Sequence, residues 1–285
     1  MGYCLTKDGM DRIWEAWEQC YDIYAPKCFA GKGRFSDTDC VRYGRVHGAD
    51  EIVFTQKAEY SAKEFLLPNA ETLFYFTEDQ VTESKEREKE MLIFLHSCDL
   101  HALKRLDAVY LEQGMIDHYY QRLREKARFV LMGCDAAFDS CFCVDMGTNQ
   151  SPDYDMSVDQ KDGRYYIDCN MPQWDEALSQ AAESIQEVTP AFVTQTVTRI
   201  TLPTQMPQKI LQDDFWRQYD GRCIAWTLQF CLPHLHLFYH AGYVLYGKRK
   251  SGGKKTGMGF LYGRRVCGCC RWRHIPQKAW RTDAL

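Results

Sequence analysis

The chain has 285 residues, of which 45% are hydrophobic and 14% aromatic, so it can bury the core of one large domain or two ordinary ones. No apolar run approaches the roughly 18 residues that span a bilayer, and the N-terminus lacks a secretory pattern, so we expect a cytoplasmic protein without a membrane span. The net charge of −4 conceals an asymmetry, because residues 226–285 hold 11 Lys and Arg against one acidic residue.

The N-terminal part of the chain is predicted to mix helices with short strands. Apolar residues at helical spacing follow Thr6, a residue type that caps the first turn of helices. Ser61 is followed three residues later by a glutamate, which predicts the start of a shorter helix. Runs of β-branched and aromatic residues predict strands at 41–46, 51–54 and 72–77.

A strand–helix–helix–strand unit is predicted in the middle of the chain. Two apolar runs, 90–96 and 128–132, have the length and composition of buried strands. The residues between them predict one helix across 103–110 and a second at about 118–126. This order favours a parallel strand pair with a right-handed crossover, so both strands would end at the same edge of a sheet.

The later elements complete the predicted domain plan. A strand at 164–168 and an amphipathic helix at 173–187 precede a proline- and threonine-rich connector that is expected to contain a strand. The predicted fold class is α/β, with α+β as the alternative, and the expected core is a mixed sheet with helices. We place the α/β domain at 1–210 and the start of a ferredoxin-like domain at 211–225.

Fourteen cysteines exceed what packing requires, and a reducing compartment disfavours structural disulfides. Cys98 and Cys134 each follow the end of a predicted parallel strand, where ligands bind in open α/β sheets. Cys141 and Cys143 come soon afterwards, in a loop that closes at Gly147. These four thiols form a candidate metal or cluster site, and the alternative is that they are packing or interface cysteines. The scattered cysteines are interpreted as buried small hydrophobic residues: Cys4, Cys20, Cys28, Cys40 and Cys169.

The segment around Cys223 carries the remains of a second cluster motif. If two bases are inserted in the codon of Trp226, the codons that follow permit cysteines at positions 223, 226, 229 and 233, with proline at 234. This is the spacing of bacterial ferredoxins, whose thiolates bind the iron of [4Fe-4S] clusters. The basic composition begins at the same place. We therefore predict that 226–285 is an out-of-frame, disordered basic tail and that Cys223 is the surviving ligand of the motif.

A literal interpretation of the tail gives a different function. Its potential zinc ligands are Cys231, His234, His236, His240, Cys267, Cys269 and Cys270. The basic run 248–255 has the charge of a nucleic-acid contact, although neither pattern has a specific spacing. A zinc or nucleic-acid binding module is therefore the alternative, whereas the main expectation is that the chain binds no nucleic acid.

Several motifs resemble those of a known family. They are 97–102, 106–107, 119–124, Cys134, 141–147 and 221–225. Together these residues resemble the iron-sulfur subunit of anaerobic sulfite reductase and its relatives, the beta subunits of soluble nickel-iron hydrogenases. The resemblance covers about 1–225 and is absent from the rest of the chain.

The resemblance implies an electron-transfer subunit of an oxidoreductase complex. In such a complex a flavoprotein subunit takes electrons from NADH, the iron-sulfur subunit passes them through [4Fe-4S] clusters, and a sirohaem subunit reduces sulfite to hydrogen sulfide. The family holds two of these clusters in its C-terminal region. Here Trp226, Gln229 and Pro233 stand at three ligand positions of the first cysteine run and only Cys223 matches, so this chain as written is not expected to bind them.

The four-cysteine set remains as the site of a possible further cluster in the α/β domain. Asp99, His101 and Asp145 are interpreted as side chains that support it or as helix caps, and for His101 a structural role beside the cap is favoured. An electron relay to a hydrogenase-type complex shares nearly every feature and is the alternative function. The chain has neither a nucleophile elbow nor a phosphate-binding loop, so no catalytic residues are expected in it.

Overall fold

The computed structural model describes residues 2–202, apart from 34, 36, 69, 77–79 and 85–86, together with 240–245 and 258–264. These residues fall into two compact units. The larger unit contains 2–67 and 87–202, and the smaller unit contains a four-stranded sheet. The candidate site lies entirely in the larger unit.

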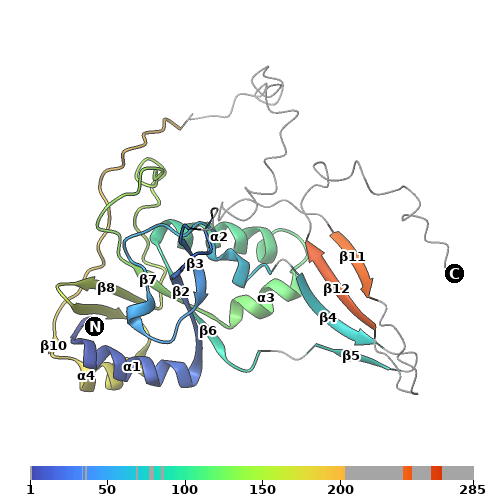
Figure 1. The fold of residues 1–285 in the computed structure, drawn as a ribbon, viewed down its shortest axis with the longest axis horizontal. Coiled ribbons are helices and arrows are strands. Elements are labelled where there is room, and N and C mark those ends of the chain that lie inside the picture. Colours follow the sequence, from blue (N-terminus) through green and yellow to red (C-terminus); the bar gives the residue numbers. More distant parts are fainter. Residues whose placement is uncertain are drawn as a thin grey trace. The chain divides into compact units, whose positions relative to one another are not determined.

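An eight-stranded mixed sheet forms the centre of the larger unit (Figure 1). In sheet order its strands are β10 (Ser184–Ile185), β1 (Gly2–Leu5), β9 (Arg164–Cys169), β8 (Met156–Lys161), β7 (Ala127–Met132), β6 (Glu90–Leu95), β2 (Tyr21–Phe29) and β3 (Cys40–Arg45). The central strands β8, β7, β6 and β2 run parallel, and the outer strands pair antiparallel. The predicted α/β class and the predicted parallel pair are therefore confirmed.

Helices pack on both faces of this sheet. They are α1 (Lys7–Cys20), α2 (Ser97–Asp107), α3 (His118–Glu125) and α4 (Asp175–Ala181), with short turns η1 (Ala49–Glu51), η2 (Ala62–Phe65), η3 (Ala108–Glu112) and η4 (Pro172–Trp174). In β6, Leu92 and Phe94 face the core beneath α1 and α4, whereas Ile93 and Leu95 face the core beneath α2 and α3. None of the helices among the described residues is long and apolar enough to cross a bilayer.

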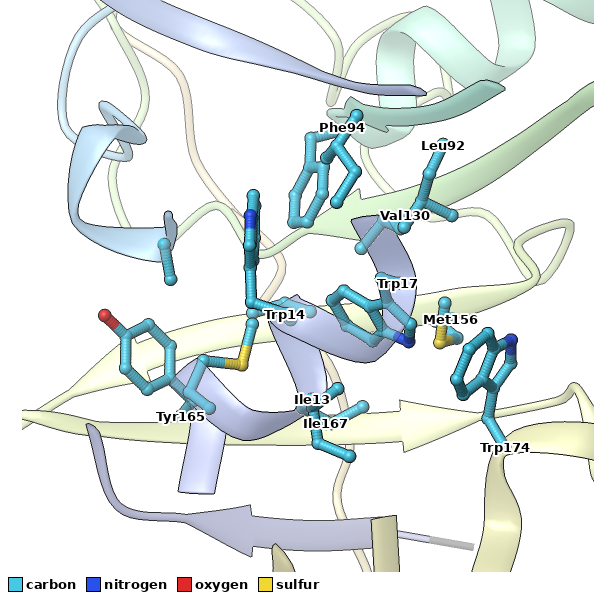
Figure 2. Packing of buried hydrophobic residues seen from close by; sticks show 14 of the residues in the cluster. Ile13, Trp14, Trp17, Leu92, Phe94, Val130, Met156, Tyr165, Ile167 and Trp174 are labelled. Atoms are coloured by element: carbon cyan, nitrogen blue, oxygen red, sulfur yellow. The ribbon is translucent and has the colours of Figure 1, made fainter. Parts of the chain in front are cut away.

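The core beneath α1 is rich in tryptophan (Figure 2). Trp14 and Trp17 of α1 lie with ring centroids 6.0 Å apart, and Trp14 approaches Phe94 of β6 at 5.9 Å. Trp17 meets the edge of Trp174 at 6.3 Å. The helix begins as predicted, because the Gly9 N–H donates to Thr6 Oγ1 at 3.2 Å.

The core on the opposite face fixes the start of α2. Leu100, Leu103 and Leu106 lie three residues apart on this helix and are buried with the β6 residues Ile93 and Leu95. The first turn of α2 is therefore held at the carboxyl end of β6, which is where the candidate site is found.

Some predicted elements differ from the observed ones. The strand predicted at 51–54 is wrong, because the chain forms the turn η1 and only Ile52 makes an isolated bridge. The helix predicted at 173–187 is too long: it ends at Ala181, since Ala182 is extended and the next residues pair with β1 as β10. The helix predicted after Ser61 is the single turn η2. The described part of the connector, 188–202, contains no strand.

The smaller unit is an antiparallel sheet. Its strands, in the order β11, β12, β4 and β5, are His240–Leu245, Met258–Arg264, Ala70–Phe76 and Val81–Glu83. Two of them come from the segment 226–285, and β4 confirms the strand predicted at 72–77. The remainder of 226–285 and the predicted domain start at 211–225 lie outside the described residues, so the predicted domain boundaries stay predictions.

Candidate functional site

The ends of β6 and β7 form the floor of the candidate site. The two strands pair in parallel up to Leu95 opposite Leu131, and His96 Nδ1 lies 3.4 Å from the Met132 carbonyl oxygen. Cys98 comes three residues after the end of β6, and Cys134 two residues after the end of β7. The parallel arrangement therefore brings these two distant cysteines to one edge of the sheet, as the sequence predicted.

A cavity of about 200 Å³ lies at this edge. Its lining includes all four predicted thiols, those of Cys98, Cys134, Cys141 and Cys143. This volume is smaller than the roughly 300–1,000 Å³ of pockets that hold drug-sized organic ligands. The arrangement therefore favours a small thiol-bound group over a large organic cofactor.

Backbone hydrogen bonds shape the loop that carries Cys141 and Cys143. The Cys141 N–H donates to the Phe138 carbonyl at 2.9 Å, and the Thr148 N–H donates to the Cys143 carbonyl at 2.9 Å. Gly147 has φ of +63°, a conformation that favours glycine, and lets the loop close. The loop predicted to end at Gly147 therefore does so through a left-handed turn.

Cys134 is held by two neighbouring segments. Its N–H donates to the Ala191 carbonyl at 2.9 Å, and the Ala191 N–H donates to Asp159 Oδ2 at 2.9 Å. Gly133 allows this arrangement, because a Cβ atom there would collide with Asp159 Oδ1. The β7 end, β8 and the chain at 191 are thus locked together beside the thiol.

The electrostatics indicate that the four thiols are close neighbours. Burial raises the pKa of Cys98 well above its ordinary value, with further increases from the Asp99 carboxylate and from the other three thiols. The side chain of Cys98 is nevertheless exposed to solvent, and it lines the cavity with the other three cysteines. Burial first, and then Cys141 and Cys143, raise the pKa of Cys134 to about 11.

The same causes act within the loop, where burial and then Cys141 raise the pKa of Cys143. Because thiolate charges repel one another, positive charge bound among Cys98, Cys134 and Cys143 would favour their ionisation. Iron in a cluster supplies such charge, because metal binding displaces the thiol protons.

Cationic side chains also line the cavity. Lys57 and Arg105 are among its lining residues, and Lys57 Nζ donates to Ser140 Oγ at 3.2 Å. His96 and His101 are also among the lining residues. The positive charges of Lys57 and Arg105 favour an anion, and a cluster held by four thiolates carries net negative charge. The sequence did not single out Lys57 or Arg105, because neither lies within a motif.

The three polar residues named beside the cysteines have different positions. Asp99 and His101 line the cavity. His101 Nε2 lies 2.7 Å from the Gln150 carbonyl, so this residue joins α2 to the following loop and does not cap the helix. Asp145 is absent from the lining and instead accepts hydrogen bonds from Arg199 and from the Ile200 N–H.

The four cysteines are the residue type that holds the iron of [4Fe-4S] clusters. Within the part of the chain that the structure describes, no group of three or more His, Cys, Asp or Glu side chains is placed to hold one metal ion. In a [4Fe-4S] cluster each thiolate binds a different iron, so the sulfur atoms lie farther apart than around one zinc ion. Four thiols spread around a compact cavity are compatible with that geometry.

The other predicted cysteines fall into three groups. Cys4, Cys40 and Cys169 are buried, as predicted for small hydrophobic residues. The prediction is wrong for Cys20 and Cys28, which are exposed. The remaining ligand candidate, Cys223, lies outside the described residues, as do all the potential zinc ligands of the tail except His240, which lies in β11.

Some residues that carried the family resemblance have a structural role. Asp107 of α2 accepts a hydrogen bond from the Tyr120 hydroxyl at 2.6 Å, and its two carboxylate oxygens share the Arg124 Nε–H, each at 3.1 Å. Tyr120 also stacks on Tyr110, with ring centroids 4.7 Å apart. These contacts fasten α3 to α2 and to η3, so they support the position of α2 rather than the chemistry of the cavity.

Comparison with known proteins gives one partial match. Over 113 residues the chain is 33% identical to the beta subunit of sulfhydrogenase 2 from Pyrococcus furiosus. That stretch is 39% of this chain and 33% of the relative, so the chain spans about a third of the length of the curated relative that it matches. No family model and no solved structure matches. Over part of its length, this chain is therefore related to a hydrogenase beta subunit.

Proposed function

We propose that this chain is an electron-transfer subunit of a multi-subunit oxidoreductase and that Cys98, Cys134, Cys141 and Cys143 hold a [4Fe-4S] cluster. The observation that carries the proposal is that these four thiols line one compact cavity at the carboxyl edge of a parallel sheet. Cysteine thiolates are the usual ligands of such clusters, and this edge is where α/β sheets bind ligands.

The residues around the cavity would each have a defined part. A bound cluster supplies reversible one-electron chemistry. The four thiolates would hold it, and Lys57 and Arg105 would offset its negative charge. Phe138 also lines the cavity and would limit the access of water. No residue of this site is proposed to act on a substrate.

The identity of the complex has two candidates. The partial match to a sulfhydrogenase beta subunit supports a hydrogenase-type complex. The motifs shared with the iron-sulfur subunit of anaerobic sulfite reductase support an NADH-linked complex in which a flavoprotein subunit supplies electrons and a sirohaem subunit reduces sulfite. Both candidates require the same electron relay in this chain, so the site alone does not distinguish them.

The C-terminal part of the proposal rests on the sequence. We propose that the α/β domain extends to about residue 210 and that 211–225 begins a ferredoxin-like domain whose two clusters are lost beyond Ala225. A chain restored by two bases near codon 226 would regain the first cysteine run. The restored chain is therefore expected to bind more iron than the chain as written.

The test is spectroscopic. The full chain, purified without oxygen and reduced with dithionite, should give the electron paramagnetic resonance signal of a reduced [4Fe-4S] cluster. Absence of that signal after reconstitution with iron and sulfide would contradict the proposal. Co-purification from the native host then separates the two complexes, since a nickel-containing partner indicates a hydrogenase and a sirohaem-containing partner indicates a sulfite reductase.

The same preparation tests the alternative of a zinc or nucleic-acid binding module. Zinc without iron, or salt-sensitive retention on DNA that is lost when the chain is cut at residue 225, would support that alternative. Each of these outcomes argues against an electron-transfer role. We propose neither a nucleic-acid partner nor a membrane-embedded segment.

A further inference from the structure

The segment 191–200, here called the strap, runs along the loop that carries three of the four thiols. That loop, 134–150, is here called the cysteine loop. At its start the Cys134 N–H donates to the Ala191 carbonyl at 2.9 Å, and farther on Asn149 Nδ2 donates to the Val193 carbonyl at 2.9 Å. The two segments are separated by β8, β9 and α4 in the sequence, so their association is tertiary.

The far end of the strap is attached by three more contacts. Thr198 Oγ1 donates to the Asp139 carbonyl at 2.7 Å. Asp145 Oδ1 pairs with Arg199 Nη1 at 3.2 Å, and Asp145 Oδ2 accepts from the Ile200 N–H at 2.8 Å. The strap therefore contacts the cysteine loop near its beginning, middle and end.

Asp145 is placed to transmit this attachment to the thiols. It lies two residues after Cys143, and its side chain is only 16% exposed, whereas that of Arg199 is 62% exposed. The other described hydrogen bonds of residues 142–147 are short-range, such as Met146 N–H to the Phe142 carbonyl at 3.3 Å. Longer-range contacts from α2 reach only the end of the loop, where Ser97 Oγ donates to the Thr148 carbonyl at 3.1 Å and His101 Nε2 lies 2.7 Å from the Gln150 carbonyl. A loop of this kind keeps one conformation only if longer-range contacts tie it down.

We propose that the strap positions the cysteine loop and that Asp145 is the positioning residue through which it acts. The identity of the group that the thiols bind rests on the proposed function, whereas the attachment of the strap does not. Because the strap is attached to the loop that carries the thiols, a ligand that orders the thiols should also protect the strap from opening. The inference therefore predicts that binding at the thiols slows opening of the strap, and that loosening the strap exposes the thiols.

The first test uses the full chain without iron. Backbone amides of 191–200 are followed by hydrogen exchange, and the thiols of Cys141 and Cys143 are followed by maleimide labelling. In Asp145→Ala both should react about five- to tenfold faster than in the wild type, since two attachments are lost. Asp145→Asn can still accept from the Ile200 N–H and should show an intermediate effect.

Two strap variants and one control complete the design. Arg199→Ala and Thr198→Val remove attachments from the exposed strap side, where loss of folding is not expected, and each should accelerate labelling of the loop thiols. The control is Asp22→Asn, which breaks the 3.0 Å pair with Arg45 at a carboxylate of similar exposure, 21%. It should leave strap exchange and thiol labelling unchanged.

The outcomes separate this inference from the proposed function. If the strap variants label no faster than the wild type or the control, the positioning role is wrong, whatever iron the protein binds. If they label faster but the wild-type chain takes up no iron, the strap inference stands and the cluster proposal fails. If iron binds, reconstitution should slow exchange of 191–200 in the wild type, and unchanged exchange would contradict the coupling.

Discussion

Gly133 is the residue on which the backbone beside Cys134 most depends. A Cβ atom at this position would collide with the Asp159 carboxylate, and Asp159 is only 6% exposed, so it has little space to move. We expect Gly133→Ala to lower the free energy of unfolding by about 1–3 kcal/mol, the usual cost of overpacking. Urea denaturation monitored by circular dichroism measures this change.

Gly48→Ala is the matched control for that variant. Its Cβ atom would also approach an aspartate carboxylate, Asp50 Oδ1 at 2.6 Å, but Asp50 is exposed and its side chain can rotate away. Gly48→Ala should therefore change the unfolding free energy much less. Equal effects of the two substitutions would mean that the close approach of Gly133 to Asp159 is unimportant.

The buried carboxyl group of Asp159 leads to a prediction of how stability depends on pH. Burial raises its pKa above the ordinary value, and the hydrogen bond from the Ala191 N–H opposes this only in part. A carboxyl group with a raised pKa in the folded state stabilises the fold below its unfolded pKa, about 3.9, and loses this contribution as pH rises through the folded pKa. The stability of the wild type relative to Asp159→Asn should therefore be greatest in acid and should decrease as pH rises.

Thermal unfolding of both proteins between pH 4 and 7 tests this sign. The Tm of Asp159→Asn minus the Tm of the wild type should increase as the pH rises. If this Tm difference stays constant or decreases as the pH rises, burial does not disfavour the Asp159 carboxylate.

At the scale of elements, the contact between α2 and α3 rests on one carboxylate. Asp107→Ala would leave the Tyr120 hydroxyl and Arg124 without this partner, and hydrogen bonds to charged groups are worth about 1.5–3 kcal/mol. We expect a loss of that order in unfolding free energy. Tyr120→Phe keeps the stacking on Tyr110 and should cost only about 1 kcal/mol.

Tyr119→Phe is the control for this pair of variants, because Tyr119 is 44% exposed and adjacent in sequence. It should be close to neutral in chemical denaturation. If Asp107→Ala is equally neutral, the network does not hold α2, and the position of Cys98 must be fixed by the apolar core alone.

The elements that were predicted well and poorly differ in what determines them. β6, β7 and α1 have strong local patterns, namely buried apolar runs and a capped amphipathic helix, and all three appear where predicted. β1 has four residues and pairs with β9, more than 150 residues away, so no local pattern marks it. The helix predicted to reach 187 stops early for the same reason, since pairing of β10 with β1 outweighs helical propensity.

At the scale of the whole molecule, the sequence predicted the candidate thiols but not their surroundings. Cys98 and Cys134 could be placed together because parallel strands end at one edge. Lys57 and the strap could not, because they reach the cavity or its loop only through tertiary contacts. Arg105 lies on α2 one turn after His101, and it was missed because it stands outside the motifs. The association of Asp145 with Arg199 and Ile200 likewise has no sequence pattern.

The most direct test of the central claim is chemical analysis of iron and acid-labile sulfide in the anaerobically reconstituted full chain. The matched variant carries Cys98→Ser, Cys134→Ser, Cys141→Ser and Cys143→Ser, and Cys20→Ser, at an exposed thiol outside the cavity, is the control. The account predicts about four iron and four sulfide per chain in the wild type and the control, and loss of both in the fourfold variant. Iron that persists in the fourfold variant, or a wild-type chain without iron, would contradict it.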